Sequence, residues 1–174
     1  ASETCALDII GAKFIRDVEN GEIVYIENNE LKSIKPFPLK KSRPCVFEYI
    51  YFARPDSILN GQCAYEYRKN FGRELAKETD IDADLIVPVP DSGNAAAIGY
   101  SQYVGKNFEL GLIRNHYVGR TFIEPVQKIR SLGVKLKLNA NKSSIKDKKI
   151  ILIDDSLVRG TTCHKIVKML YDAG

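Results

Sequence analysis

The chain has 174 residues, of which 44% are hydrophobic and 28% charged, and its net charge is +4. These proportions, with 12 glycines and 7 prolines, are typical of a folded domain and exclude a disordered tail, a collagen-like fibre and a coiled coil. No run approaches the roughly 18 apolar residues that cross a bilayer, and the first residues lack a secretory signal pattern. We therefore expect a cytoplasmic protein without a membrane partner.

The N-terminal third predicts short antiparallel strands and then a linker. Apolar residues alternate over 12–17 and 22–27, around the turn-forming pairs Asn20-Gly21 and Asn28-Asn29. A proline-rich basic stretch and an aromatic run, 47–52, follow. We divide the chain into residues 1–34, a linker and aromatic segment at 35–59, and a main domain at 60–174.

The main domain alternates predicted helices and strands. Asn60 is placed to cap a helix that extends to about Thr79, and its apolar residues recur at helical spacing: Ala64, Tyr67, Phe71 and Leu75. A strand over 85–90 passes through a tight turn into a helix over 95–103. Shorter strands are predicted at 110–114 and 134–138, a buried strand at 149–153, and a final helix at 163–172. This order predicts an α/β fold, with a mostly parallel sheet flanked by helices.

Basic residues are concentrated in one segment. Residues 114–149 hold ten basic and two acidic side chains, so this segment carries +8 and the rest of the chain −4. Such an excess indicates either a solvated lysine-rich loop or a polyanionic ligand. About twenty residues of the segment have no apolar periodicity, and a loop of that length is usually functional or mobile. RNA is disfavoured because the segment lacks regularly interleaved aromatic residues for stacking on bases.

The most informative stretch follows the last predicted strand. Asp154 and Asp155 fall at its carboxyl end, where parallel α/β sheets bind ligands. Gly160, Thr161 and Thr162 then present backbone N–H groups and hydroxyls at a helix N-terminus, which is an anion site. Because two carboxylates repel a phosphate, they suit sugar hydroxyls or a hydrated Mg²⁺ nearby. A sugar phosphate satisfies both demands, and the chain has neither a P-loop nor a dinucleotide-binding glycine motif.

These residues carry a family resemblance. The stretch 150–162 resembles the signature of type I phosphoribosyltransferases, which bind 5-phosphoribosyl-1-pyrophosphate (PRPP). Several further stretches, at 45–57, 89–92, 115–123 and 137–140, are similar to the glutamine PRPP amidotransferase family. The resemblance covers essentially the whole chain. It implies a phosphoribosyltransferase-like sheet, incomplete at the C-terminus, at 60–174, preceded at 1–34 by the end of an antiparallel glutaminase domain of the N-terminal-nucleophile type.

The resemblance also implies an activity: a glutamine-dependent pentosyltransferase that forms 5-phosphoribosylamine from PRPP and glutamine-derived ammonia, at the first committed step of purine synthesis. Asp154, Asp155 and Ser92 would organise Mg²⁺, and Arg120 and Lys137 would contact pyrophosphate. The PRPP-binding loop would comprise Asp154, Asp155, Ser156, Leu157, Val158, Arg159, Gly160, Thr161 and Thr162. Purine nucleotides as feedback inhibitors and a homo-oligomer, without nucleic acid, are further implications.

Three positions qualify the resemblance. Ala1 stands where the family's glutaminase would need its cysteine nucleophile, so we expect an internal fragment of a longer enzyme, inactive alone. Cys45 resembles the first ligand of the [4Fe-4S] cluster that some members carry, and one cysteine cannot hold such a cluster. His116 stands where arginine is commoner. The alternative to an enzyme is a non-catalytic, PRPP-binding regulatory module.

Overall fold

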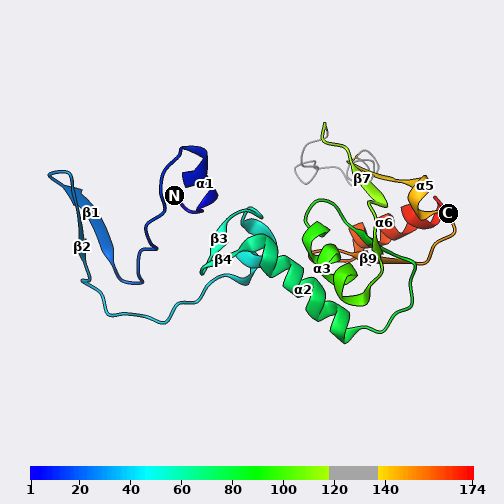
Figure 1. Cartoon of the computed structure of the whole chain (residues 1–174), viewed down its shortest axis with the longest axis horizontal. Helices are drawn as coiled ribbons and strands as arrows, with labels where there is room; N and C mark the ends of the chain where they lie inside the picture. Colours follow the sequence, from blue (N-terminus) through cyan, green and yellow to red (C-terminus); the bar gives the residue numbers. More distant parts are fainter. Residues whose placement is uncertain (118–136) are drawn as a thin grey trace.

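The computed structural model describes residues 1–117 and 137–174. It is elongated, with an N-terminal arm at one end, an α/β body at the other, and one long helix between them (Figure 1). The arm contains a short helix, α1 (Cys5–Ile9), and a hairpin of β1 (Ile23–Glu27) and β2 (Glu30–Ile34). The predicted strand over 12–17 is wrong, because those residues follow an irregular path.

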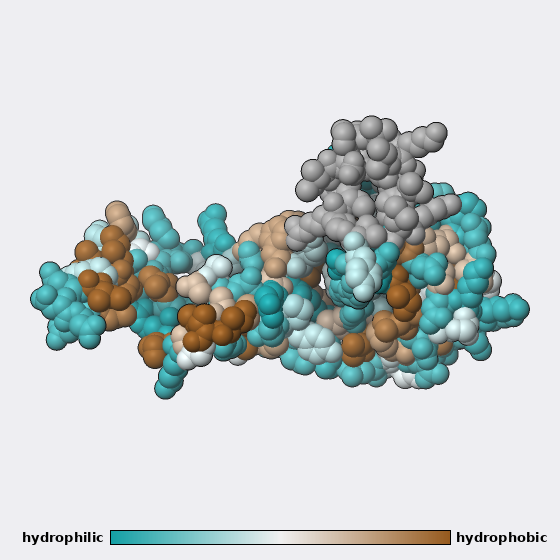
Figure 2. Space-filling view, turned by 90° about the horizontal axis from the view of Figure 1, so that it is seen from above, coloured by the Kyte–Doolittle hydropathy of each residue, from teal (hydrophilic) through white to brown (hydrophobic). Residues whose placement is uncertain are grey.

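The hairpin turn at Asn28 and Asn29 is confirmed. Both residues have positive φ, 51° and 64°, which the two central positions of a type I′ turn require. The antiparallel register pairs Glu27 with Glu30 directly across this turn. Large apolar side chains of the hairpin remain exposed, notably Ile26 at 75%. They contribute to the apolar surface at this end of the molecule (Figure 2).

A π-helical segment, η1 (Glu48–Phe52), and a small hairpin of β3 (Ile58–Leu59) and β4 (Gln62–Cys63) lead into α2 (Ala64–Glu78). The helix therefore begins three residues later than predicted. Asn60 and Gly61 have φ values of 48° and 81° and form the turn between β3 and β4, so Asn60 does not cap α2. Asn-Gly is as strong a signal for a hairpin turn as asparagine is for a cap, and the turn prevails here.

The α/β body is built on a three-stranded parallel sheet in the order β6-β5-β9. Its strands are β5 (Leu85–Pro88), β6 (Asn107–Phe108) and β9 (Ile150–Ile153). The remaining elements are the helices α3 (Asn94–Val104), α5 (Lys142–Ile145) and α6 (Thr161–Tyr171), and a separate antiparallel pair, β7 (Leu112–Arg114) and β8 (Leu138–Ala140). The predicted α/β architecture is confirmed, whereas the strand predicted over 134–138 begins at Leu138, with residues 134–136 outside the described residues.

Two apolar clusters cover the two faces of the sheet. Val87 of β5 packs with β7, β8, α5 and α6 on one face. Ile86 of β5 and Ile153 of β9 pack with Ala97 and Tyr100 of α3 on the other. This alternation along β5 buries the strand on both faces, as expected for a central parallel strand. Within residues 1–117 and 137–174, every helix is too short or too polar to span a membrane.

The packing of α2 on α3 depends on two glycines. A Cβ atom added at Gly72 would lie 1.8 Å from the carbonyl oxygen of Ala96, and one at Gly99 would lie 1.9 Å from that of Lys69. The buried positions of α2 are Ala64, Arg68, Gly72 and Ala76. The apolar stripe predicted from sequence is displaced, because Phe71 and Leu75 are 42% and 40% exposed. Small residues bury more completely here because the two backbones approach so closely.

Candidate functional site

The carboxyl ends of β5 and β9 bring the predicted site residues together. The two strands pair in parallel, with Pro88 opposite Ile153. Ser92 follows β5 and Asp155 follows β9, and the Ser92 hydroxyl donates a hydrogen bond of 2.8 Å to Oδ1 of Asp155. Ligands of open α/β sheets bind beyond these strand ends, so the two residues lie where the fold favours a site.

The two neighbouring carboxylates have different environments. Asp154 Oδ1 accepts the backbone N–H of Asp155 at 2.9 Å, while Asp155 Oδ2 accepts the Ser156 hydroxyl at 3.1 Å. Burial raises the pKa of Asp154 to about 6, and its hydrogen bond with the Asp155 side chain adds to the rise. A pair in which one carboxyl resists ionisation favours the arrival of a cation or of hydroxyl donors.

The turn between β5 and α3 is held closely against β9. The backbone N–H of Val89 donates to Ile153 O at 2.8 Å, and that of Gly93 donates to Val89 O at 3.0 Å. A Cβ atom at Gly93 would lie 2.6 Å from Ile153 O. Glycine is therefore required at this position for the close approach that places Ser92 against Asp155.

Arg114 joins this turn from the end of β7. Its guanidinium Nη1 donates to Oδ2 of Asp91, the residue before Ser92, and the two groups form an ion pair. The buried Nε of Arg114 and Oδ1 of Asn94 have no protein hydrogen-bond partner among the described residues. We did not predict Arg114 as a site residue, because only the fold brings β7 to this turn.

The predicted phosphate loop is open to solvent. Ser156, Leu157, Val158 and Arg159 are exposed, and Leu157 and Val158 are 72% and 88% exposed. Gly160 has φ of 70°, a conformation that favours glycine, and precedes the first turn of α6. Thr161 and Thr162 are exposed at that N-terminus. The loop thus presents hydroxyls and helix N–H groups next to the carboxylates, and its use as an anion site stays a prediction.

A cavity of about 250 Å³ lies beside the carboxylates. Its polar lining residues are Arg68, Ser92, Asp154 and Asp155, and the other lining residues are Ile50, Phe71, Gly72, Leu75, Ala96 and Ile153. Arg68 was not predicted as a site residue, because the apolar spacing placed the buried stripe of α2 at Phe71 and Leu75 instead of at Arg68 and Gly72. It is only 6% exposed. Burial lowers the pKa of Arg68, and the nearby charge of Asp155 opposes that shift.

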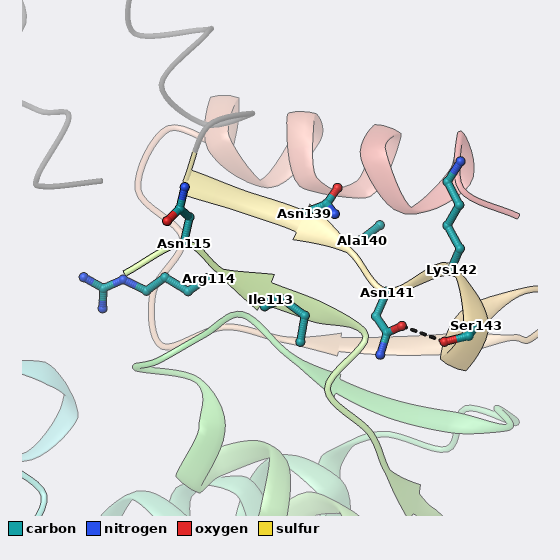
Figure 3. A pocket seen from close by; sticks show the side chains of 8 residues that line it. All are labelled: Ile113, Arg114, Asn115, Asn139, Ala140, Asn141, Lys142 and Ser143. Carbon is teal, nitrogen blue, oxygen red and sulfur yellow. Dashed lines mark hydrogen bonds between the residues drawn. The ribbon is translucent and has the colours of Figure 1, made fainter. Parts of the chain in front are cut away.

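A larger, open groove of about 540 Å³ runs along β7 and β8 (Figure 3). Among its lining residues are Arg114, Asn115, Asn139 and Lys142. Lys137 precedes β8 at this point, and its carbonyl accepts the Asn115 N–H at 2.8 Å. Lys137 therefore lies beside the strand that carries Arg114, whereas Arg120 lies outside the described residues.

The four cysteines form no disulfide bond. Cys45 is exposed, Cys5 is buried and accepts a hydrogen bond of 3.1 Å from the Ser57 hydroxyl, and all four cysteines are free thiols. Among the residues that the structure describes, no group of three or more His, Cys, Asp or Glu side chains is arranged to hold a metal ion. These residues alone do not fit an iron–sulfur cluster, which takes four ligands.

The chain is similar over its whole length to one part of a set of longer proteins. It is 60% identical to an amidophosphoribosyltransferase from Rhizobium etli and 49% identical to one from Archaeoglobus fulgidus, in each case over 99% of the chain. It spans 36% and 38% of these relatives. No family model matches the chain.

Solved structures agree. A structure described as glutamine PRPP amidotransferase from B. subtilis, complexed with ADP and GMP, matches 99% of the chain with a TM-score of 0.88 and 48% identity. Another, described as the allosteric regulatory enzyme of purine biosynthesis, matches with the same TM-score and identity. The chain spans 38% and 37% of these structures.

Proposed function

From the premise that this chain belongs to the amidophosphoribosyltransferase family over the segment it covers, we propose that it provides the PRPP site of such an enzyme. The reaction is formation of 5-phosphoribosylamine from PRPP and glutamine-derived ammonia, with release of pyrophosphate and glutamate. The observation that carries this proposal is the meeting of Ser92, Asp154 and Asp155 at adjacent strand ends, beside the N-terminus of α6.

The carboxylates suit the ribose end of PRPP. Asp154 and Asp155 would accept hydrogen bonds from the ribose hydroxyls, while the hydroxyls and N–H groups of residues 156–162 bind the 5′-phosphate. The separation of acids from phosphate avoids the repulsion that a shared position would cause. Binding at both ends fixes the sugar and thereby orients its C1 for attack by ammonia, which needs no general base.

Mg²⁺ fits the same residues. Two carboxylates and the Ser92 hydroxyl supply the oxygen ligands that this ion prefers. Burial is the main cause of the raised pKa of Asp154, and a nearby cation would stabilise its ionised form. The described residues hold no larger acidic cluster, so further ligands would come from the substrate and water, as is usual for Mg²⁺. When bound, the ion would stabilise charge on the departing pyrophosphate.

Cations of the chain would share that role. Lys137 and Arg120 are proposed to contact pyrophosphate. Arg114 is proposed to do so as well, because it lies beside Asp91. Positive groups aimed at a leaving pyrophosphate stabilise the transition state most in a water-poor site. The net charge of +8 on residues 114–149 would then serve to bind the substrate.

The longer protein would use glutamine as its ammonia source, and purine nucleotides as inhibitors. The second of these is supported by a relative that was solved with ADP and GMP. Iron–sulfur ligation by Cys45 and a homo-oligomeric assembly stay predictions.

The test uses the full-length protein. Titration calorimetry with PRPP and Mg²⁺ should give a binding heat, and ammonia supplied directly should give pyrophosphate release. Asp154→Asn combined with Asp155→Asn should abolish both. Asp172→Asn, which removes an exposed carboxylate of the segment after α6, is the matched control and should abolish neither.

The outcomes separate the candidates. PRPP binding without pyrophosphate release, even with ammonia in excess, indicates the non-catalytic regulatory module. Absence of binding by the unmodified protein contradicts the proposal.

A further inference from the structure

One turn of the chain forms a wall of the carboxylate cavity without contributing a charged group to it. This is η1 (Glu48–Phe52), whose Ile50 lines the same cavity as Asp154 and Asp155. None of its residues is fully buried, and both its last residue, Phe52, and the preceding residue, Phe47, are more than half exposed. A turn with so little burial needs polar contacts to keep its place.

Arg68 supplies those contacts from inside the cavity. Its Nε donates to Tyr49 O at 2.9 Å, and its Nη2 donates to Ala53 O at 2.7 Å and to Glu48 O at 3.5 Å. One buried guanidinium thus binds carbonyls at both ends of the turn. Only arginine has enough fixed donors for this, since lysine presents a single point charge.

The far end of the same segment is fastened to the N-terminal arm. Oε2 of Glu3 accepts the Arg54 N–H at 2.7 Å and the Ser57 hydroxyl at 2.7 Å. The Tyr49 ring also packs edge-on against Tyr67 of α2, with ring centres 4.9 Å apart. The turn is therefore anchored on three sides, and Arg68 is the anchor that also borders the site.

We propose that Arg68 is a positioning residue for PRPP binding, which holds η1 so that Ile50 closes the wall of the cavity beside Asp154 and Asp155. This inference rests on the proposed function. Arg68 acts through the turn: its Nε and Nη2 donate to carbonyls of the turn, and Ile50 shields the cavity beside the carboxylates from water. Hydrogen bonds from the carboxylates to a ligand are stronger where water is excluded.

The test compares Arg68→Lys with Arg73→Lys in the full-length protein. Arg73 lies on the same helix, bonds to side chains of Asn70 and Gln102, and does not line the cavity, so it is a matched control. We expect Arg68→Lys to weaken PRPP binding by about tenfold, the worth of one charge-assisted hydrogen bond. Its kcat at saturating PRPP should stay within about twofold, because the cost falls on binding.

A double-mutant cycle tests whether Arg68 acts through Ile50. Ile50→Ala alone should also weaken PRPP binding. The double variant should bind PRPP at most about twofold more weakly than Arg68→Lys, because both changes open the same wall. Amide hydrogen exchange over residues 48–53 should be faster in Arg68→Lys and unchanged in Arg73→Lys. If Arg68→Lys fails to fold, the Ile50→Ala measurement still tests the wall.

Three results would overturn the inference. They are PRPP binding by Arg68→Lys equal to that of Arg73→Lys, fully additive effects in the cycle, and unchanged binding by Ile50→Ala. Each of these results is informative only if the unmodified protein binds PRPP. If the unmodified protein does not bind PRPP, the proposed function and this inference are overturned together.

Discussion

The Ser92 hydroxyl lies 2.8 Å from Oδ1 of Asp155, although the two residues are 63 positions apart in the sequence. The contact joins the turn after β5 to the carboxyl end of β9. It fixes one carboxylate oxygen while leaving Asp154 with its own backbone contact. The acidic pair is therefore held before any ligand arrives.

Ser92→Ala should weaken binding of PRPP with Mg²⁺ by about tenfold, because a hydrogen bond to a charged group is lost. Titration calorimetry of the full-length protein measures the change. Ser143→Ala is the control, since that exposed hydroxyl makes a similar 2.8 Å bond to Asn141 and does not line the carboxylate cavity. If the two variants bound PRPP with equal affinity, Ser92 would not be part of the site.

Gly93→Ala should be more severe than Ser92→Ala. The added Cβ would lie 2.6 Å from Ile153 O and 2.8 Å from Val89 O, so the turn must move away from β9. We expect a loss of about 2 kcal/mol in the free energy of unfolding, together with a larger loss of PRPP affinity than in Ser92→Ala. Urea unfolding and calorimetry measure the two effects, and normal affinity would contradict the proposed geometry.

The pH dependence of stability should report Asp154. Its pKa is raised from 3.8 to about 6 by burial, so the folded state binds more protons than the unfolded state between these values. The free energy of unfolding should therefore fall as pH rises from about 4 to about 6. Because Asp154 is only half-buried, we expect a change of about 1 kcal/mol.

Asp154→Asn should flatten this profile, because the variant has no carboxyl to ionise at that position. Urea midpoints measured between pH 4 and pH 7, without Mg²⁺ or substrate, provide the test. Asp172→Asn should keep the slope of the unmodified protein. A slope that persists in Asp154→Asn would assign it to another group.

Local patterns predicted the elements that carry the site. The apolar run before Asp154 and Asp155 and the glycine that precedes α6 are contiguous signals, and both lie where the sequence indicated. The resemblance added Ser92, whose partner lies far away in the chain. Arg68 and Arg114 were not predicted as site residues, because their contacts depend on how α2 and β7 pack against other elements.

The two errors arise because local sequence patterns do not show tertiary contacts. The alternation over 12–17 has the period of a strand, but strands also need a partner, and the hairpin forms downstream instead. In α2, apolar periodicity selected Phe71 and Leu75, whereas the buried stripe includes Gly72 and Ala76. Hydrophobicity alone does not reveal that a helix interface is formed by small residues in close backbone contact.

Gly72→Ala tests that interface. Its Cβ would lie 1.8 Å from Ala96 O, a backbone atom that cannot yield without separating α2 from α3. We expect a loss of about 3 kcal/mol in the free energy of unfolding, the upper range for overpacking. Since Gly72 and Ala96 both line the carboxylate cavity, PRPP affinity should also fall.

Gly105→Ala is the control for this experiment. Among residues 1–117 and 137–174, nothing lies within 4 Å of the added Cβ, so the penalty from these residues comes from the left-handed backbone, with φ of 67°. It should cost about 1 kcal/mol and leave PRPP affinity unchanged. If urea unfolding gave Gly72→Ala the same small loss, the close approach of α2 and α3 would not be the constraint that shapes this wall of the site.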